Sequence, residues 1–146
     1  EYLAKRFVAA RKVLTGGYSN AVTIGVRGFD THNESQQSLC SQLAVMLGIF
    51  MDELGTLMDD TVVIVMSDFD RTAITNSSDG TDHHPVTTVP IFSGDNIAIT
   101  PGPYGSATTA QLDKGTVYRR DIWLSVLRAL DVPQPEKFFR DANYLF

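Results

Sequence analysis

The stretch VVIVMSDFDRTAITNSSDGTDHHPVTTVPIF, residues 62–92, decides how the rest of the chain is interpreted. It opens with an apolar, β-branched run that ends at Met66, and such a run is typical of a strand buried on both faces. A polar loop follows, and a second short apolar run, residues 89–92, predicts another strand. The two strands therefore frame a loop that carries an arginine, several carboxylates and two of the three histidines.

Around this stretch, the spacing of apolar side chains predicts the remaining elements. Helices are predicted where apolar residues recur every three or four positions, over residues 1–14, 35–58 and 119–130. A β-branched run at 21–26 predicts a strand, and a shorter one is expected at 97–99. Strand, long helix and strand in this order form a βαβ unit, whose strands are parallel. We therefore predict an α/β fold with a mostly parallel sheet flanked by helices.

Size and charge restrict the classes of partner. The 146 residues, 43% of them hydrophobic, suffice for a single domain with one core, which we place at residues 1–146. A net charge of -5 argues against nucleic acid as a partner, because binding a phosphate backbone needs clustered lysine and arginine. No apolar run approaches the length that spans a bilayer, so no membrane partner is expected. Cys40 is the only cysteine, and we expect it to be a buried structural thiol rather than a nucleophile.

All three histidines lie beside aspartates at the ends of predicted strands. Side chains two residues apart in an extended segment point to the same side, so Asp30 and His32 can face one ion. Carboxyl ends of parallel strands share one edge of a sheet, where ligands bind in open α/β folds. The candidate metal ligands are Asp30, His32, Asp68, Asp82, His83 and His84. Zinc takes imidazole nitrogen and carboxylate oxygen, whereas Mn, Ca or Mg would take a larger share of oxygen.

Simpler interpretations of the same residues stay open. An Asp-x-His sequence in a loop can serve helix capping or turn formation, and Asp82 can close an Asx turn. Adjacent histidines are often solvated. Arg71 can form a structural bridge to Asp68 or Asp70, or act as a fork-shaped clamp on an anion.

Four motifs then give the chain a family resemblance. They are GFDTH at 28–32, SDFDRT at 67–72, GTDHH at 80–84 and DIWLSVLRALDVPQP at 121–135. In this order the motifs resemble the C-terminal part of the alkaline phosphatase superfamily, over roughly residues 22–135. Within it, the chain is most similar to the sulfatase-like domain of unknown function 1501.

The resemblance implies a function and a role for each matching residue. It implies metal-dependent hydrolysis of phosphate or sulfate esters, with Asp30 and His32 as ligands of a first metal. Asp68 matches a ligand of a second metal, and His84 or His83 matches a late histidine ligand. Phe69 stands where many relatives carry a metal-binding His or Asn, so one ion is expected rather than two.

The resemblance also implies parts that this sequence does not carry. The nucleophile of the superfamily is a Ser, Thr or formylglycine in an N-terminal segment, so we expect the chain to be the C-terminal part of a longer sulfatase-like protein. Its partners would be a small anionic ester or that segment, and its location periplasmic or extracellular. The alternative is a non-catalytic sulfatase-like module, for binding or structure, with at most one metal.

Overall fold

The computed structural model describes residues 2–33, 36–85, 87–100, 102 and 117–146. These residues form two compact units, which are described one at a time. Unit 1 contains Glu1–Met58 and Ser67–Thr88, and unit 2 contains Asp59–Met66 and Val89–Phe146. The organisation of residues 1–146 as one domain stays a prediction.

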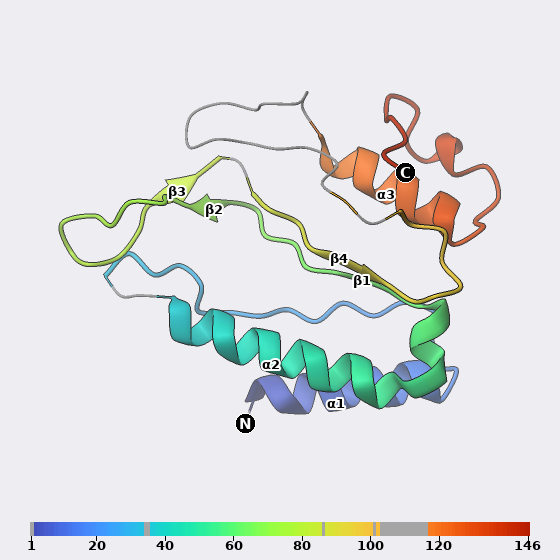
Figure 1. Ribbon diagram of the computed structural model, residues 1–146, viewed down its shortest axis with the longest axis horizontal. Helices are drawn as coiled ribbons and strands as arrows, with labels where there is room; N and C mark the ends of the chain where they lie inside the picture. Colours follow the sequence, from blue (N-terminus) through green and yellow to red (C-terminus); the bar gives the residue numbers. More distant parts are fainter. Residues whose placement is uncertain (1, 34–35, 86, 101, 103–116) are drawn as a thin grey trace. The chain divides into compact units, whose positions relative to one another are not determined.

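Two helices build the core of unit 1 (Figure 1). They are α1 (Tyr2–Thr15) and α2 (Gln37–Leu54), and a 3-10 helix, η1 (Gly55–Asp60), follows α2. The Phe7 ring packs edge-on against Phe50, with centroids 5.4 Å apart, and Arg11 pairs with Glu53 at 3.0 Å. The helices predicted at 1–14 and 35–58 are thereby confirmed, with residues 34–35 outside the described part of the chain.

The strand predicted at residues 21–26 is wrong. No strand pairing involves this segment among the described residues, and the Gly25 carbonyl instead accepts a hydrogen bond from the Arg6 guanidinium of α1. Val22, Ile24 and Val26 are half-buried while the residues between them are exposed. One-sided burial gives the same alternating pattern as a half-buried strand, which explains the incorrect prediction.

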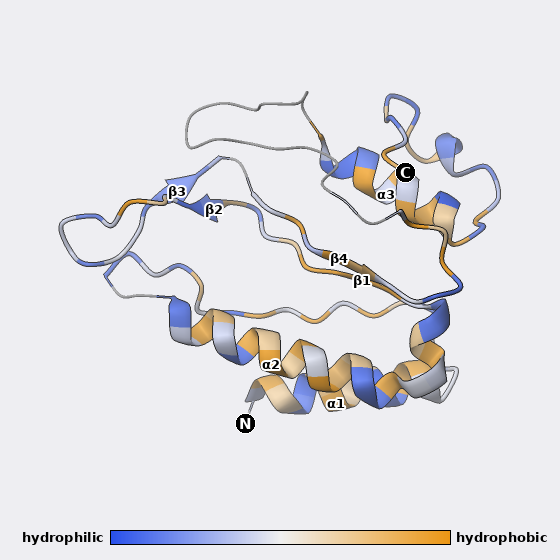
Figure 2. Ribbon diagram, viewed as in Figure 1, coloured by the Kyte–Doolittle hydropathy of each residue, from blue (hydrophilic) through white to orange (hydrophobic). Residues whose placement is uncertain are grey.

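A short ladder in unit 1 was not foreseen from the sequence. β2 (Asp70–Arg71) pairs antiparallel with β3 (His83–His84), in a register that sets Asp70 opposite His84 and Arg71 opposite His83. Both strands are hydrophilic (Figure 2), so neither carries the apolar pattern that predicts a strand.

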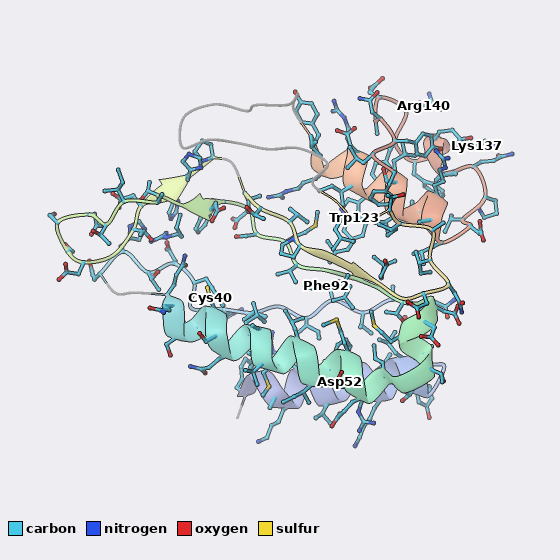
Figure 3. The ribbon with its side chains drawn as sticks, viewed as in Figure 1. Cys40, Asp52, Phe92, Trp123, Lys137 and Arg140 are labelled. Carbon is cyan, nitrogen blue, oxygen red and sulfur yellow. The ribbon has the colours of Figure 1, made fainter. Side chains whose placement is uncertain are left out.

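Two features of this part of the chain, at Cys40 and in helix α2, differ from what the sequence predicts. Cys40, in the first turn of α2, is exposed rather than buried (Figure 3). The helical span Gln37–Asp60 is long and apolar enough to cross a membrane, judged by length and composition only. Core helices of soluble proteins meet the same criterion, so the absence of a membrane partner stays a prediction.

Unit 2 contains the apolar strand pair. β1 (Val62–Ile64) lies antiparallel to β4 (Ile91–Ser93), and a hydrogen bond of 3.0 Å from the Val65 N–H to the Pro90 carbonyl extends the ladder. Both predicted strands are confirmed, although the side chains of β1 are half-buried rather than fully buried. The pairings in the described residues are antiparallel, and the mostly parallel sheet stays a prediction. The strand expected at 97–99 is instead a turn, because the Ile99 N–H bonds to the Ile97 carbonyl at 2.8 Å.

The C-terminal tail of unit 2 is fixed to helix α3 (Arg119–Ala129) by two buried polar side chains. The Asp121 carboxylate accepts hydrogen bonds from the backbone N–H groups of Tyr118 and Asn143, each at 2.7 Å. The Ser125 hydroxyl accepts one from the Leu145 N–H at 2.8 Å, and a short 3-10 helix, η2 (Pro135–Lys137), lies between α3 and this tail. The third predicted helix, at 119–130, is thereby confirmed.

Candidate metal centre

Three of the predicted ligands meet at one point of unit 1. Asp30, His32 and His83 each offer one ligand atom, and these atoms all lie within 4.8 Å of one another. The Asp30 Oδ1 atom is 3.0 Å from His32 Nε2 and 2.8 Å from His83 Nε2. All three side chains are exposed, so an ion and a small ligand can reach them from solvent.

A close approach of two backbone segments creates this meeting point. A Cβ atom added at Gly80 would lie 2.1 Å from the His32 carbonyl oxygen, so the loop that carries Gly80 rests directly on residue 32. The neighbouring Thr81 N–H donates to the Thr31 carbonyl at 3.2 Å. Only glycine permits such an approach. This accounts for the glycine of the GTDHH sequence in structural terms.

The register of β2 and β3 selects which of the two adjacent histidines joins the group. Successive side chains of a strand point to opposite faces, so His83 and His84 cannot both face Asp30. Arg71 lies opposite His83, and both contact Asp30. His84 lies opposite Asp70, outside the group.

The remaining candidate ligands have other positions. Asp68 is exposed and lies outside the group of three. Asp70 serves the backbone, since its carboxylate accepts hydrogen bonds from the N–H groups of Arg71 at 2.8 Å and Thr88 at 3.3 Å. Phe69 stacks on the His83 ring with centroids 3.8 Å apart. Phe69 therefore orients the candidate ligand His83 by an aromatic contact.

The buried side chain of Arg71, in β2, holds the Asp30 carboxylate in place by a hydrogen bond. Its side chain is 5% exposed, and its Nη1 donates to Asp30 Oδ1 at 2.9 Å. Its Nε donates to Thr81 Oγ1 at 3.1 Å and its Nη2 to the Thr81 carbonyl. Arg71 thus forms a structural bridge, to Asp30 rather than to Asp68 or Asp70, and these bonds direct it away from an external anion.

Asp82 contacts His32 from the side opposite to Asp30. Asp82 Oδ1 lies 3.3 Å from His32 Nδ1, and Asn76 Nδ2 donates both to Asp82 Oδ1 at 3.1 Å and to the His32 carbonyl at 2.9 Å. Asn76 was not among the candidate site residues predicted from the sequence. Its signal, an asparagine that opens a polar turn, is too common to predict such a role.

Hydrogen bonding favours the ionised form of both carboxylates. The bond from His83 lowers the pKa of Asp30 below its usual value, against an opposing effect of desolvation, and Arg71 and His32 lower it further. The bonds from Asn76 and His32 lower the pKa of Asp82 in the same way. An ionised Asp30 is the form that binds a cation.

The chemistry and spacing of the three ligand atoms fit a zinc ion. Two imidazole nitrogens and one carboxylate oxygen form a ligand set that zinc uses in catalytic sites, with a position left open for water. Zinc bonds of about 2.0–2.1 Å in tetrahedral geometry separate two ligand atoms by about 3.3 Å. The two separations from Asp30 Oδ1, 2.8 and 3.0 Å, are close to this value, and the two imidazole nitrogens lie within 4.8 Å of each other.

The comparison with protein families decides the membership of the chain. The model of the family described as "Protein of unknown function (DUF1501)" matches residues 2–139. The chain belongs to this family. Searches of curated proteins and of solved structures found no match. The predicted membership of the domain of unknown function 1501 family is therefore confirmed. The sulfatase-like character and the wider resemblance to the alkaline phosphatase superfamily become part of the proposal below.

Proposed function

We propose that this chain carries the metal site of a hydrolase of phosphate or sulfate esters, with Asp30, His32 and His83 as the ligands of one divalent ion. The observation that carries the proposal is the convergence of two imidazoles and one carboxylate within 4.8 Å on an exposed surface. The order of the four motifs supports the reaction class, through the resemblance to the alkaline phosphatase superfamily. The same resemblance supports the parallel α/β fold of that superfamily and export from the cytoplasm.

Some residues of the site would bind the ion, and others hold those ligands in position. When bound, a divalent ion would polarise the ester oxygen and stabilise negative charge that develops during hydrolysis. Asp30 supplies the anionic ligand, and Arg71 fixes the rotamer of its carboxylate. Phe69 fixes the plane of the His83 ring. Zinc is favoured over Mn, Ca or Mg because two of the three ligands are imidazoles.

The access of substrate and the origin of the nucleophile complete the proposal. The exposed ligands leave room for a small anionic ester on the solvent side. By resemblance, the nucleophile is a Ser, Thr or formylglycine supplied by an N-terminal segment.

Metal content and turnover, measured together, test this function. The full-length protein, with the segment that supplies the nucleophile, is stripped with a chelator and titrated with ZnCl2. Hydrolysis of p-nitrophenyl phosphate and p-nitrophenyl sulfate is then followed with and without zinc. Asp30→Ala should abolish both zinc binding and zinc-dependent turnover, whereas the matched control Asp68→Ala should keep both. Absence of zinc binding in the wild type would overturn the proposal.

A non-catalytic module with one metal is the second candidate. The bonds of Arg71 to Asp30 and Thr81 favour it, because they occupy the guanidinium that an anion would need. In this case zinc raises the melting temperature, since it binds only the folded state, while neither ester is hydrolysed.

A further inference from the structure

The two ring nitrogens of His32 face two different carboxylates. Nε2 lies 3.0 Å from Asp30 Oδ1, and Nδ1 lies 3.3 Å from Asp82 Oδ1. A neutral imidazole has one N–H donor and one lone pair, so the carboxylate that takes the donor decides which nitrogen can bind a cation.

We propose that Asp82 is a positioning residue: it accepts the Nδ1–H of His32 and thereby directs the Nε2 lone pair to a divalent cation shared with Asp30 and His83. This inference rests on the metal site proposed above and deepens it. It also reassigns Asp82, which the sequence suggested as a direct ligand.

Asn76 holds Asp82 in the orientation that this role requires. Its side-chain Nδ2 bridges Asp82 Oδ1, at 3.1 Å, and the His32 carbonyl, at 2.9 Å. Its Oδ1 accepts hydrogen bonds from the backbone N–H groups of Ser78, at 2.9 Å, and Gly80, at 3.1 Å. Because those two partners can only donate, they fix which end of the amide faces Asp82.

The geometry separates positioning from direct coordination. Asp30, His32 and His83 form a group in which every ligand atom lies within 4.8 Å of the others, and Asp82 is outside it. The Asp82 carboxylate contacts the Nδ1 atom of His32 and the side-chain amide of Asn76. A carboxylate behind a metal-binding imidazole fixes its tautomer and raises its basicity, and removing such a partner typically weakens metal binding by about 10- to 100-fold.

The test combines zinc affinity with two spectroscopic measurements. Asp82→Asn and Asp82→Ala are compared with the wild type by competition against a zinc-chelating dye, and Co2+ absorption reports the number of ligands. Long-range 15N–1H spectra of the zinc-bound protein report the tautomer of His32. Asp79→Asn is the matched control, because Asp79 lies in the same loop with a φ of 58°, which asparagine tolerates.

The expected result is an Nδ1–H tautomer at His32 and a loss of zinc affinity of about 10- to 100-fold in both Asp82 variants, with an unchanged Co2+ spectrum. The control should bind zinc like the wild type. Zinc bound through Nδ1, affinity in both Asp82 variants equal to the control, or a changed Co2+ spectrum would overturn the positioning role while the metal site stands. A wild type that binds no zinc would overturn the metal site itself, and this inference with it.

Discussion

Replacing Gly80 with alanine should break the candidate metal centre by separating the two segments that form it. The added Cβ would lie 2.1 Å from the carbonyl oxygen and 2.2 Å from the carbonyl carbon of His32, and 2.6 Å from the Asn33 nitrogen. All three are backbone atoms, which cannot rotate away as a flexible side chain can. The loop around Gly80 must therefore move.

The size of this movement determines how much free energy of unfolding is lost in Gly80→Ala. Real Cβ contacts essentially never fall below 3.0 Å, so the loop must retreat by about 0.9 Å. The same shift stretches the bond from Thr81 N–H to the Thr31 carbonyl, now 3.2 Å, and the bond from Asn76 to the His32 carbonyl, now 2.9 Å. Two lost hydrogen bonds at about 1 kcal/mol each and about 1–3 kcal/mol of overpacking give a loss of about 3–5 kcal/mol. If releasing the loop from residue 32 costs less free energy than this strained contact, the loop moves away and the three metal ligands separate.

Urea denaturation and zinc titration measure both outcomes, with Gly48→Ala as the control. Gly48 lies within α2, and no atom of the described residues lies within 4 Å of a Cβ added there. Alanine at that position should stabilise the protein by about 0.5–1 kcal/mol, because glycine has the greater freedom to lose in a helix. Gly80→Ala with wild-type zinc affinity and wild-type stability would refute the close approach on which the site depends.

Three further predictions concern charge and hydrogen bonding. Because the pKa values of Asp30 and Asp82 are lowered, the hydrogen bonds of these carboxylates stabilise the fold above the usual carboxyl pKa of 3.8, and this stabilisation is lost as the pH falls through the lowered pKa values. Urea denaturation at a series of pH values should show this loss of stability, and Asp30→Asn should make the loss smaller. A pH profile of stability that is the same in Asp30→Asn and the wild type would contradict this prediction. Arg71→Lys should cost about 1–3 kcal/mol, because a lysine cannot reproduce the fork of bonds to Asp30 and the neighbouring backbone, and wild-type stability would speak against this role. Ser125→Ala should cost a similar amount and speed hydrogen exchange at Leu145, whose N–H loses its acceptor; unchanged exchange there would disprove the link to the tail.

Local sequence patterns predicted the elements that carry a regular pattern of apolar side chains. The period of apolar residues located α1, α2 and α3, and β-branched runs located β1 and β4. Residues 21–26 show the limit of such patterns, because their alternating burial resembles a strand although no strand in the described part of the chain pairs with them. Hydrogen-bonded partners distant in sequence have no such local signature.

In the candidate site, too, local spacing was predictable from the sequence, whereas contacts between distant segments were not. The same-side placement of Asp30 and His32 follows from a separation of two residues, and the structure brings both together. The choice of His83 over His84 depends on the register of a ladder of two residues per strand, whose polar sequence carries no strand pattern. The partner of Arg71 lies 41 residues away, so its assignment required the three-dimensional structure.

The most direct test of a metal centre formed by Asp30, His32 and His83 is zinc stoichiometry in two neighbouring variants, His83→Ala and His84→Ala, measured by calorimetric titration of chelator-stripped protein. Because His83 lies in the group and His84 lies outside it, we predict one zinc per chain in the wild type and in His84→Ala, and no measurable binding in His83→Ala. Wild-type zinc binding in His83→Ala, or its loss in His84→Ala alone, would contradict the site.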